Sequence, residues 1–231
     1  MTDLPAVSLL DDITAQGAEV RTRLRELLHR HEYSGDIKGR VFAGYVAIAL
    51  EHHQAIWHLT DQNLRGAAMA VVRTVVDAFL RALWINAYGT EEQCEQAWRD
   101  KFRFPKMHEM LKQIKEAYFG HVDAEKDPEF AVTVKKFFKS LNKVWSVASS
   151  YTHPGGRQIA RRFTGDEVKP SYSDGATAEA LNLATIALLL LMRAFFMSME
   201  KQREADDVAT LLMQYNPDFG SSGGHRPRRR G

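Results

Sequence analysis

The chain has 231 residues, of which 45% are hydrophobic and 26% are charged. This composition is typical of one soluble globular domain with enough apolar residues to build a core, and it argues against two full domains. A single cysteine, Cys94, excludes an internal disulfide and a cysteine-rich zinc site. The acidic start of the sequence lacks the basic-then-apolar order of a signal peptide, so we expect a cytoplasmic protein.

The net charge of +2 is unevenly distributed along the chain. A Gly/Ser spacer near the end precedes four arginines, and the rest of the chain has 27 basic against 29 acidic residues, a charge of −2. We therefore expect a folded domain over 1–220 and a disordered basic tail over 221–231. The charge of the tail would attract nucleic acid phosphates or an anionic surface, and a solubilising role explains the tail equally well.

Apolar residues recur with helical spacing along nearly the whole chain, which predicts an all-α bundle of about five to seven helices without a sheet. In chain order we expect helices over 7–33, 40–60, 64–88, 91–100, 105–119, 128–150 and 176–215. Pro105 suits the first turn of its helix. The last helix contains the apolar run 186–192, which is far shorter than the roughly 20 residues that cross a bilayer. We interpret this helix as the central buried helix and expect no membrane contact.

Three histidines lie close together in the second expected helix, His52, His53 and His58. Metal ligands on one helix favour spacings of three or four residues, because those positions share a face. The longer spacings from His52 and His53 to His58 place these side chains on different faces of the helix. The sequence therefore predicts neither a metal site nor a bound cofactor.

One side of the third expected helix carries a polar stripe, formed by Arg73, Asp77, Arg81 and Trp84. At about 100° per residue, these side chains share one side of the helix and border its apolar face. A half-buried arginine beside a carboxylate keeps its orientation and its planar donors, which suits phosphate recognition. A salt bridge that ties helices together is the alternative explanation.

The least ordinary segment is 149–162, SSYTHPGGRQIARR. The Pro-Gly-Gly sequence that follows His153 predicts a tight turn, which places the imidazole at a helix end. A histidine titrates at roughly pH 6.5 and could act there as a general base or acid. Five neighbouring side chains could bind a phosphate group, namely Ser149, Tyr151, Arg157, Arg161 and Arg162. A helix end whose His and Tyr only anchor the turn is the alternative explanation.

Three segments together carry a family resemblance, ALEHHQAIWHLTDQNLRGAAMAVVRTVVDAFLRALWI, FRFPKMHEMLKQI and SSYTHPGGRQIARR. They resemble a widespread bacterial family of all-α proteins with an Arg-x3-Asp/Glu helix and a Tyr-Thr-His-x-Gly turn. The resemblance covers roughly 41–172. More distantly, this family is similar to the HEPN superfamily, helical bundles that include metal-independent ribonucleases of toxin–antitoxin and antiphage systems.

The HEPN resemblance implies a homodimer whose facing helices bring basic residues and histidines together around RNA. It implies that His153 helps to deprotonate the ribose 2′-hydroxyl, with Arg73 and Asp77 as polar partners. The usual superfamily signature is Arg followed by His after four to six residues, and no Arg precedes His153 at that distance. The literal match from Arg103 to His108 contains a proline that is expected to start a helix, so we interpret it as accidental.

Two functions are compatible with these residues. The first is a HEPN-like ribonuclease or toxin module of a bacterial defence or toxin–antitoxin system. Its catalytic residues would be His153, Arg73 and Asp77. Its substrate-binding residues would be Arg81, Ser149, Tyr151, Arg157 and Arg161.

The second function is a non-catalytic bundle that binds a nucleotide, RNA or a protein partner such as an antitoxin. The same residues would then be structural ties, and the basic tail would be an electrostatic tether. The missing Arg before His153 favours this second function, whereas the polar stripe and the terminal histidine favour the first. A homodimer is expected in both cases, because so many apolar helix faces in a short chain leave surface to cover.

Overall fold

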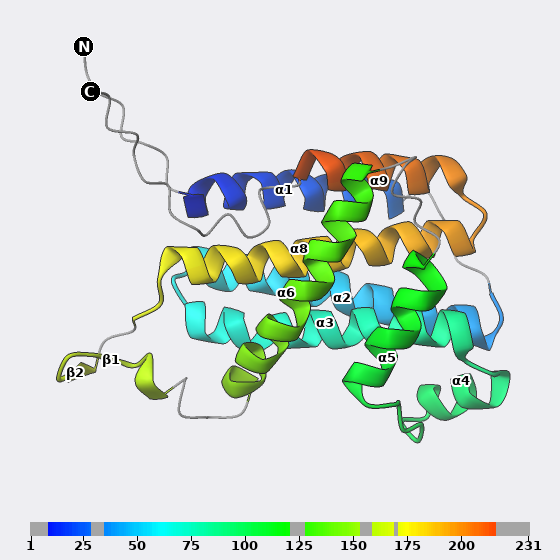
Figure 1. Ribbon diagram of the computed structural model, residues 1–231, viewed down its shortest axis with the longest axis horizontal. Helices are drawn as coiled ribbons and strands as arrows, with labels where there is room; N and C mark the ends of the chain where they lie inside the picture. The colour runs from blue at the N-terminus through cyan, green and yellow to red at the C-terminus, as the bar shows by residue number, and fades with distance from the viewer. Residues whose placement is uncertain (1–8, 29–34, 121–127, 153–158, 169–170, 216–231) are drawn as a thin grey trace, which may run out of the picture.

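The computed structural model describes residues 9–28, 35–120, 128–152, 159–168 and 171–215, so the basic tail lies outside the described residues. Eight α-helices have described bounds: α1 (Leu9–Leu28), α2 (Ile37–Asp61), α3 (Arg65–Tyr88), α4 (Glu91–Trp98), α5 (Met107–Ile114), α6 (Pro128–Thr152), α8 (Asp174–Ser198) and α9 (Gln202–Tyr215). A π-helical turn, η1 (Lys115–Phe119), continues α5. Two short strands, β1 (Phe163–Thr164) and β2 (Glu167–Val168), form a hairpin. The predicted all-α class is confirmed (Figure 1).

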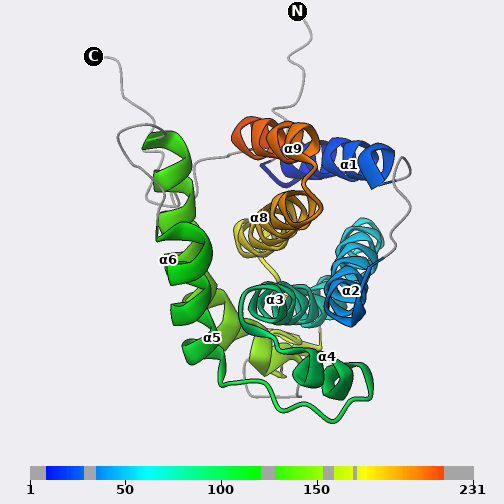
Figure 2. The ribbon, with the colours of Figure 1, turned by 90° about the vertical axis from the view of Figure 1, so that its right-hand side faces the viewer.

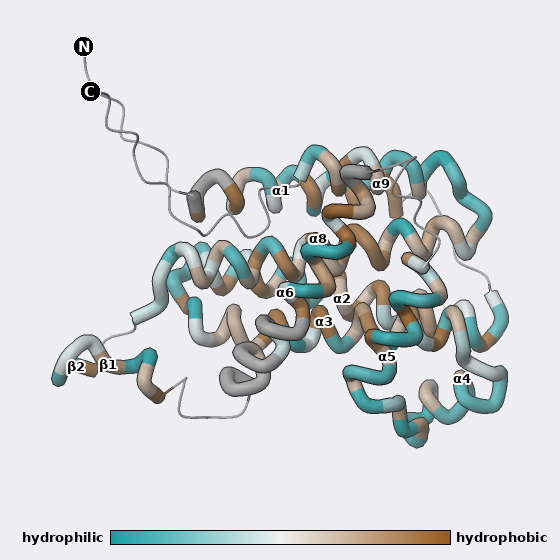
Figure 3. The backbone as a smooth tube through the Cα atoms, viewed as in Figure 1, coloured by the Kyte–Doolittle hydropathy of each residue, from teal (hydrophilic) through white to brown (hydrophobic). Residues whose placement is uncertain are grey.

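The central element of the bundle is α8 (Figure 2). The pair α1 and α9 lies on one side of it, the pair α2 and α3 lies on the other, and α6 crosses over α3 and α8. Brown, hydrophobic residues cover much of α8 in Figure 3. This helix is long and apolar enough to span a membrane by length and composition, yet 83% of its most apolar window is buried inside the protein. The apolar run 186–192 is buried throughout, as expected for a core helix.

The long helix predicted over 176–215 is in fact two helices. The first, α8, ends at Ser198, and α9 begins at Gln202 and packs back against α8. Glu200 lies between them with φ of 58°, the left-handed conformation that commonly ends a helix. Glycine usually occupies this position because it has no Cβ, and here a glutamate occupies it. The prediction is wrong because the residues at the break include no glycine or proline to mark a turn.

The predicted absence of a sheet is also wrong. Phe163 pairs with Val168, and Thr164 pairs with Glu167, across an antiparallel hairpin. Gly165 supplies the positive φ, 62°, that the connecting turn requires. The hairpin projects from the end of the bundle at which α3 and α8 begin (Figure 1). Strands of two residues are too short for an alternating pattern to reveal them in a sequence.

Local side chains decide where several helices begin. The carboxylate of Asp36 accepts a hydrogen bond from the backbone N–H of Gly39 at 2.8 Å, so α2 begins before the predicted position. Thr90 forms a capping box at the start of α4, which begins where predicted. The next helix, α5, begins at Met107, so Pro105 precedes the helix instead of lying in its first turn.

The N-terminal helix α1 reaches the bundle through one very close contact. A Cβ atom on Gly17 would lie 2.2 Å from Cζ2 of Trp57. The indole of Trp57 is 1% exposed, and the guanidinium carbon of Arg21 lies 5.0 Å from its ring centroid. Therefore α1 can approach α2 this closely only because residue 17 has no side chain.

Candidate functional site

Two arginines are bonded to the loop before α8 at the end of the bundle where α3 and α8 begin. Arg65, the first residue of α3, donates from Nη1 to the carbonyl oxygen of Tyr172 at 2.9 Å and forms an ion pair with Asp174 at 2.6 Å. Arg161 donates from Nη1 to the carbonyl oxygen of Ser171 at 2.9 Å. These bonds join the start of α3 to the loop before α8, more than 100 residues further along the chain, and join that loop to Arg161, ten residues before Ser171.

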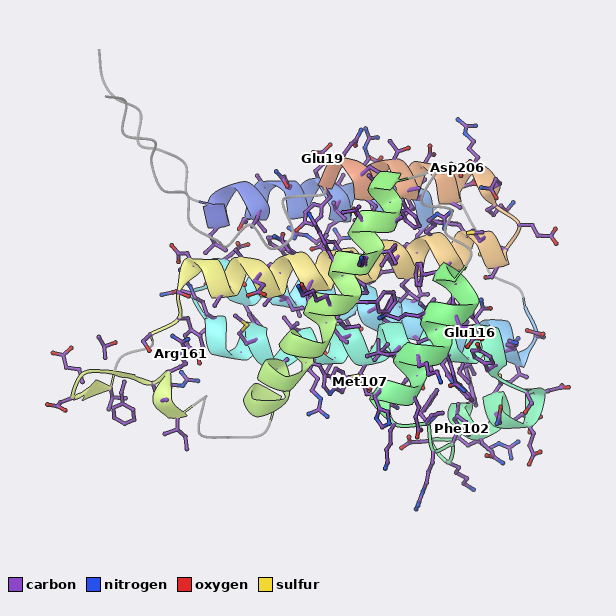
Figure 4. The ribbon with its side chains drawn as sticks, viewed as in Figure 1. Glu19, Phe102, Met107, Glu116, Arg161 and Asp206 are labelled. Atoms are coloured by element: carbon purple, nitrogen blue, oxygen red, sulfur yellow. The ribbon has the colours of Figure 1, made fainter. Side chains whose placement is uncertain are left out.

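Arg162 completes this group. Its Nη2 atom lies 3.2 Å from the position that a Cβ atom on Gly66 would occupy, and the hydroxyl oxygen of Tyr172 lies 2.5 Å from the same position. The absence of a side chain at Gly66 therefore lets the guanidinium approach the first turn of α3. We call Arg65, Arg161 and Arg162 the basic end. Figure 4 shows Arg161 between the hairpin and the starts of α3 and α8.

The start of α3 adds to the positive potential of the basic end. Its N-cap residue, Leu64, makes no side-chain capping bond, whereas Ser173 caps α8 by accepting a hydrogen bond from the Ala176 N–H at 3.3 Å. The first N–H groups of an uncapped helix carry partial positive charge and attract anions. The paired carboxylate of Asp174 offsets one of the three arginine charges. The basic end thus combines positive side chains with a positive helix end.

The segment that carries His153 follows α6 in the sequence and precedes Arg161 and Arg162 of the basic end. The helix ends at Thr152, and the described chain resumes at Ile159, two residues before Arg161. His153 itself lies outside the described residues. Its predicted contact with the polar stripe of α3 therefore stays a prediction.

Three further residues with predicted ligand roles belong to the same sequence motif. Arg157 lies outside the described residues. Ser149 and Tyr151 lie in the last turn of α6, where the structure describes the backbone alone. Of the predicted phosphate ligands in this motif, Arg161 and Arg162 are the two that the structure places, and both are exposed.

The three charged residues of the polar stripe of α3 lie half-buried at the border of the core, as its spacing predicts, and Trp84 is buried. The Nε atom of Arg81 lies 2.8 Å from Oδ2 of Asp77. The guanidinium carbon of Arg73 lies 5.1 Å from the ring centroid of Trp145 in α6. Because α6 crosses α3 here, the guanidinium of Arg73 lies over this indole, and its role in holding an anion stays a prediction. Asp77 forms its ion pair with Arg81, not with Arg73.

The ion pair between Asp77 and Arg81 belongs to a larger network. Burial lowers the pKa of Arg81, but the Asp77 carboxylate and the Tyr45 hydroxyl outweigh this effect and raise its pKa. Burial has the opposite effect on the Tyr45 hydroxyl and raises its pKa. The guanidinium carbon of Arg81 also lies 4.9 Å from the ring centroid of Phe104. These contacts tie α2, α3 and the segment before α5 together, which is the structural alternative predicted for the stripe.

His53 is completely buried, at 0% exposure. Trp57 donates from Nε1 to His53 Nε2 at 3.1 Å, and Thr185 Oγ1 lies 2.9 Å from the same nitrogen. Because Nε2 accepts, the neutral ring carries its proton on Nδ1, which has no hydrogen-bond partner among the described residues. Burial, and after it the charge of Arg21, lowers the pKa of His53 to about 3. A neutral, enclosed imidazole of this kind supports the core rather than acid–base chemistry.

The other two histidines of this helix are placed differently from His53. His52 is half-buried and His58 is exposed, so the three rings do not converge. The residues that the structure describes include no group of three or more His, Cys, Asp or Glu side chains that could hold a metal ion. The one clue to the buried role of His53 in the sequence is the spacing of four residues to Trp57, which places both rings on one helix face.

An open groove of about 290 Å³ lies between α1 and α9. It is lined by Arg23, Glu26, Leu27, Asp207, Thr210, Leu211 and Gln214. Figure 4 shows Asp206 of α9 at the opposite end of the molecule from Arg161. The lining carries both signs of charge, so it favours no single class of charged ligand.

The family of unknown function DUF6988 matches residues 46–219, which is more than half of the chain. The chain belongs to this family. No curated protein and no solved structure matches it. The matched part of this DUF6988 protein includes the basic end and the sequence motif of His153, whereas α1 lies outside it. The basic end therefore lies in the part of the chain that defines the family.

Arg65 is the residue of the DUF6988 basic end that the sequence analysis does not single out. In the sequence, Arg65 and Gly66 follow a polar segment and are easily interpreted as the end of a turn. The structure places them at the start of α3, opposite residues that lie more than 100 positions further along the chain. The signal in the sequence that could have revealed this contact is Gly66, because a glycine inside a helix often marks a place where another segment approaches the backbone closely.

Proposed function

We propose that this DUF6988 protein binds RNA through contacts between its basic end and the phosphate backbone. The convergence of Arg65, Arg161 and Arg162 beside an uncapped helix start supports this proposal. Guanidinium groups that neighbouring atoms already hold lose less freedom when they bind a phosphate. Arg161 and Arg162 are exposed, so their surface suits a polymer that passes over it.

The double variant Arg161→Gln/Arg162→Gln is expected to bind RNA about tenfold more weakly at low salt. The slope of log affinity against log salt concentration should also fall by about 1.4, because two phosphate contacts to a single strand are lost. Fluorescence anisotropy with an end-labelled RNA of about 16 nucleotides measures both quantities.

The matched control for this experiment is Arg99→Gln/Arg203→Gln. It removes two exposed arginines, one at the end of α4 and one in the first turn of α9. This control has the same net charge as the test variant. An equal loss of affinity in the two double variants would mean that overall charge, and not the basic end, holds the RNA.

A second candidate function is cleavage of the bound RNA without a metal ion, in the manner of HEPN-like toxins and defence ribonucleases. It is favoured because the segment that carries His153 lies between α6 and the basic end in the sequence. His153 precedes Arg161 by eight residues, a chain length that can reach the surface proposed to bind RNA. It would accept the proton of the ribose 2′-hydroxyl, and the arginines would stabilise the charge that develops on the phosphate.

Incubation of labelled RNA in excess EDTA tests this candidate. The unmodified protein is expected to cleave the RNA, and His153→Asn is expected to bind RNA and melt as before but to lose cleavage. If the unmodified protein leaves the RNA intact, ribonuclease activity is excluded and RNA binding alone remains. A large fall in melting temperature in His153→Asn would instead assign His153 to the structure of the turn. The homodimer, the antitoxin partner and the cytoplasmic location stay predictions.

A further inference from the structure

The hairpin beside the basic end presents an apolar face to solvent. Phe163 and Val168 are direct partners in the antiparallel pair, so both side chains point to one face, while Thr164 and Glu167 point to the other. Phe163 is 45% exposed and Val168 is 80% exposed. The hairpin projects away from the helices (Figure 1). An aromatic ring and an aliphatic side chain therefore lie side by side on an arm that extends into solvent.

The charges around this arm indicate what it can bind. Arg161 and Arg162 immediately precede Phe163, and their contacts with the bundle hold them at the base of the arm. Phe163 thus directly follows two arginines whose guanidinium groups are held in restricted positions. The far end of the arm carries Asp166 and Glu167, which repel phosphate groups. A polyanion is therefore expected to cross the base of the arm rather than its tip.

We propose that Phe163 is a stacking platform for an unpaired RNA base whose neighbouring phosphates lie on the basic end. This inference rests on the proposed RNA binding and adds that the RNA is single-stranded. A base inside a duplex has both faces covered by its neighbours, whereas an unpaired base can place one face on an aromatic ring. Val168, directly opposite in the hairpin, extends the apolar support beside the ring.

A second copy of the chain fits this face less well than an RNA base does. Stable protein–protein contacts bury roughly 800 Å² on each partner. The exposed large apolar side chains of segment 159–168 are Ile159, Phe163 and Val168, and three partly exposed side chains provide only a fraction of that area. A single base needs no more than one ring to stack on, and the adjacent arginines supply the charge that its phosphates require.

Phe163→Ala tests the proposal with two probes, a labelled oligouridylate of about 12 nucleotides and a blunt RNA duplex of the same length. Anisotropy is expected to show an approximately tenfold loss of affinity for the single strand and less than about a twofold change for the duplex. The salt dependence should stay the same, because no charge is removed. Phe163→Trp should keep the affinity for the single strand, since an indole also stacks on a base.

The matched control is Trp98→Ala, which removes an aromatic side chain that is 62% exposed on α4. It should leave both affinities unchanged.

The proposal is overturned if Phe163→Ala binds the single strand normally, or if it loses affinity equally for both probes. If Phe163→Ala binds RNA normally but no longer forms a dimer in light scattering, the arm contacts a second copy of the chain instead. If Arg161→Gln/Arg162→Gln weakens binding but Phe163→Ala does not, RNA binding stands and the stacking platform is rejected. If the unmodified protein binds neither probe, the proposed function fails as well.

Discussion

Gly17→Ala is expected to lower the free energy of unfolding by about 3 kcal/mol. The added methyl group would lie within 2.7 Å of three ring atoms of Trp57. This indole cannot easily move, because it is almost fully buried and its Nε1 donates to His53. Alanine gains about 1 kcal/mol over glycine in a helix, but the steric clash outweighs that gain. Urea denaturation followed by circular dichroism measures the change.

Gly44→Ala is the matched control for this substitution. Gly44 lies inside α2, and a Cβ atom there would meet nothing within 4 Å. This variant should therefore be more stable than the unmodified protein by up to about 1 kcal/mol, the difference in helix propensity alone. If Gly17→Ala is stabilised to the same extent, the close contact between α1 and Trp57 does not exist as described.

Acidification below pH 6.5 is expected to destabilise the protein through His53. Its pKa is about 3 in the folded protein, against 6.5 for an ordinary histidine. Between these values the unfolded chain binds a proton at this site and the folded chain does not, so stability falls as the pH falls. The contribution is complete above pH 6.5 and amounts to a loss of about 2 kcal/mol at pH 5. Urea denaturation across this pH range measures the change.

His53→Gln isolates this contribution from the other titrating groups. The variant should be less stable at neutral pH because it disturbs a buried site, but its stability should depend less on pH between 5 and 6.5 by about 1 kcal/mol per unit. His58→Gln replaces an exposed histidine of the same helix and should keep the pH dependence of the unmodified protein. Equal pH dependence in His53→Gln and the unmodified protein would show that His53 takes up its proton without unfolding.

Some of the architecture follows from local sequence patterns alone. Helical spacing of apolar residues predicted the all-α class and the positions of α3, α4 and α6 to within a few residues. The half-buried position of the polar stripe on α3 was predictable for the same reason, because it depends on the geometry of one helix. The pattern failed at Glu200, where a residue that favours helices takes the conformation that ends one.

The partners of these residues were decided by the tertiary structure. The ion pair between Asp77 and Arg81 is an i,i+4 contact within α3 that spacing alone allows, but packing brought Tyr45 and Phe104 against Arg81 from other segments. Packing also set the indole of Trp145 over Arg73. The basic end shows this most clearly, since Arg65 and its ion-pair partner Asp174 are 109 positions apart. Periodicity indicates which face of a helix is apolar, but which segment covers that face depends on packing between distant parts of the chain.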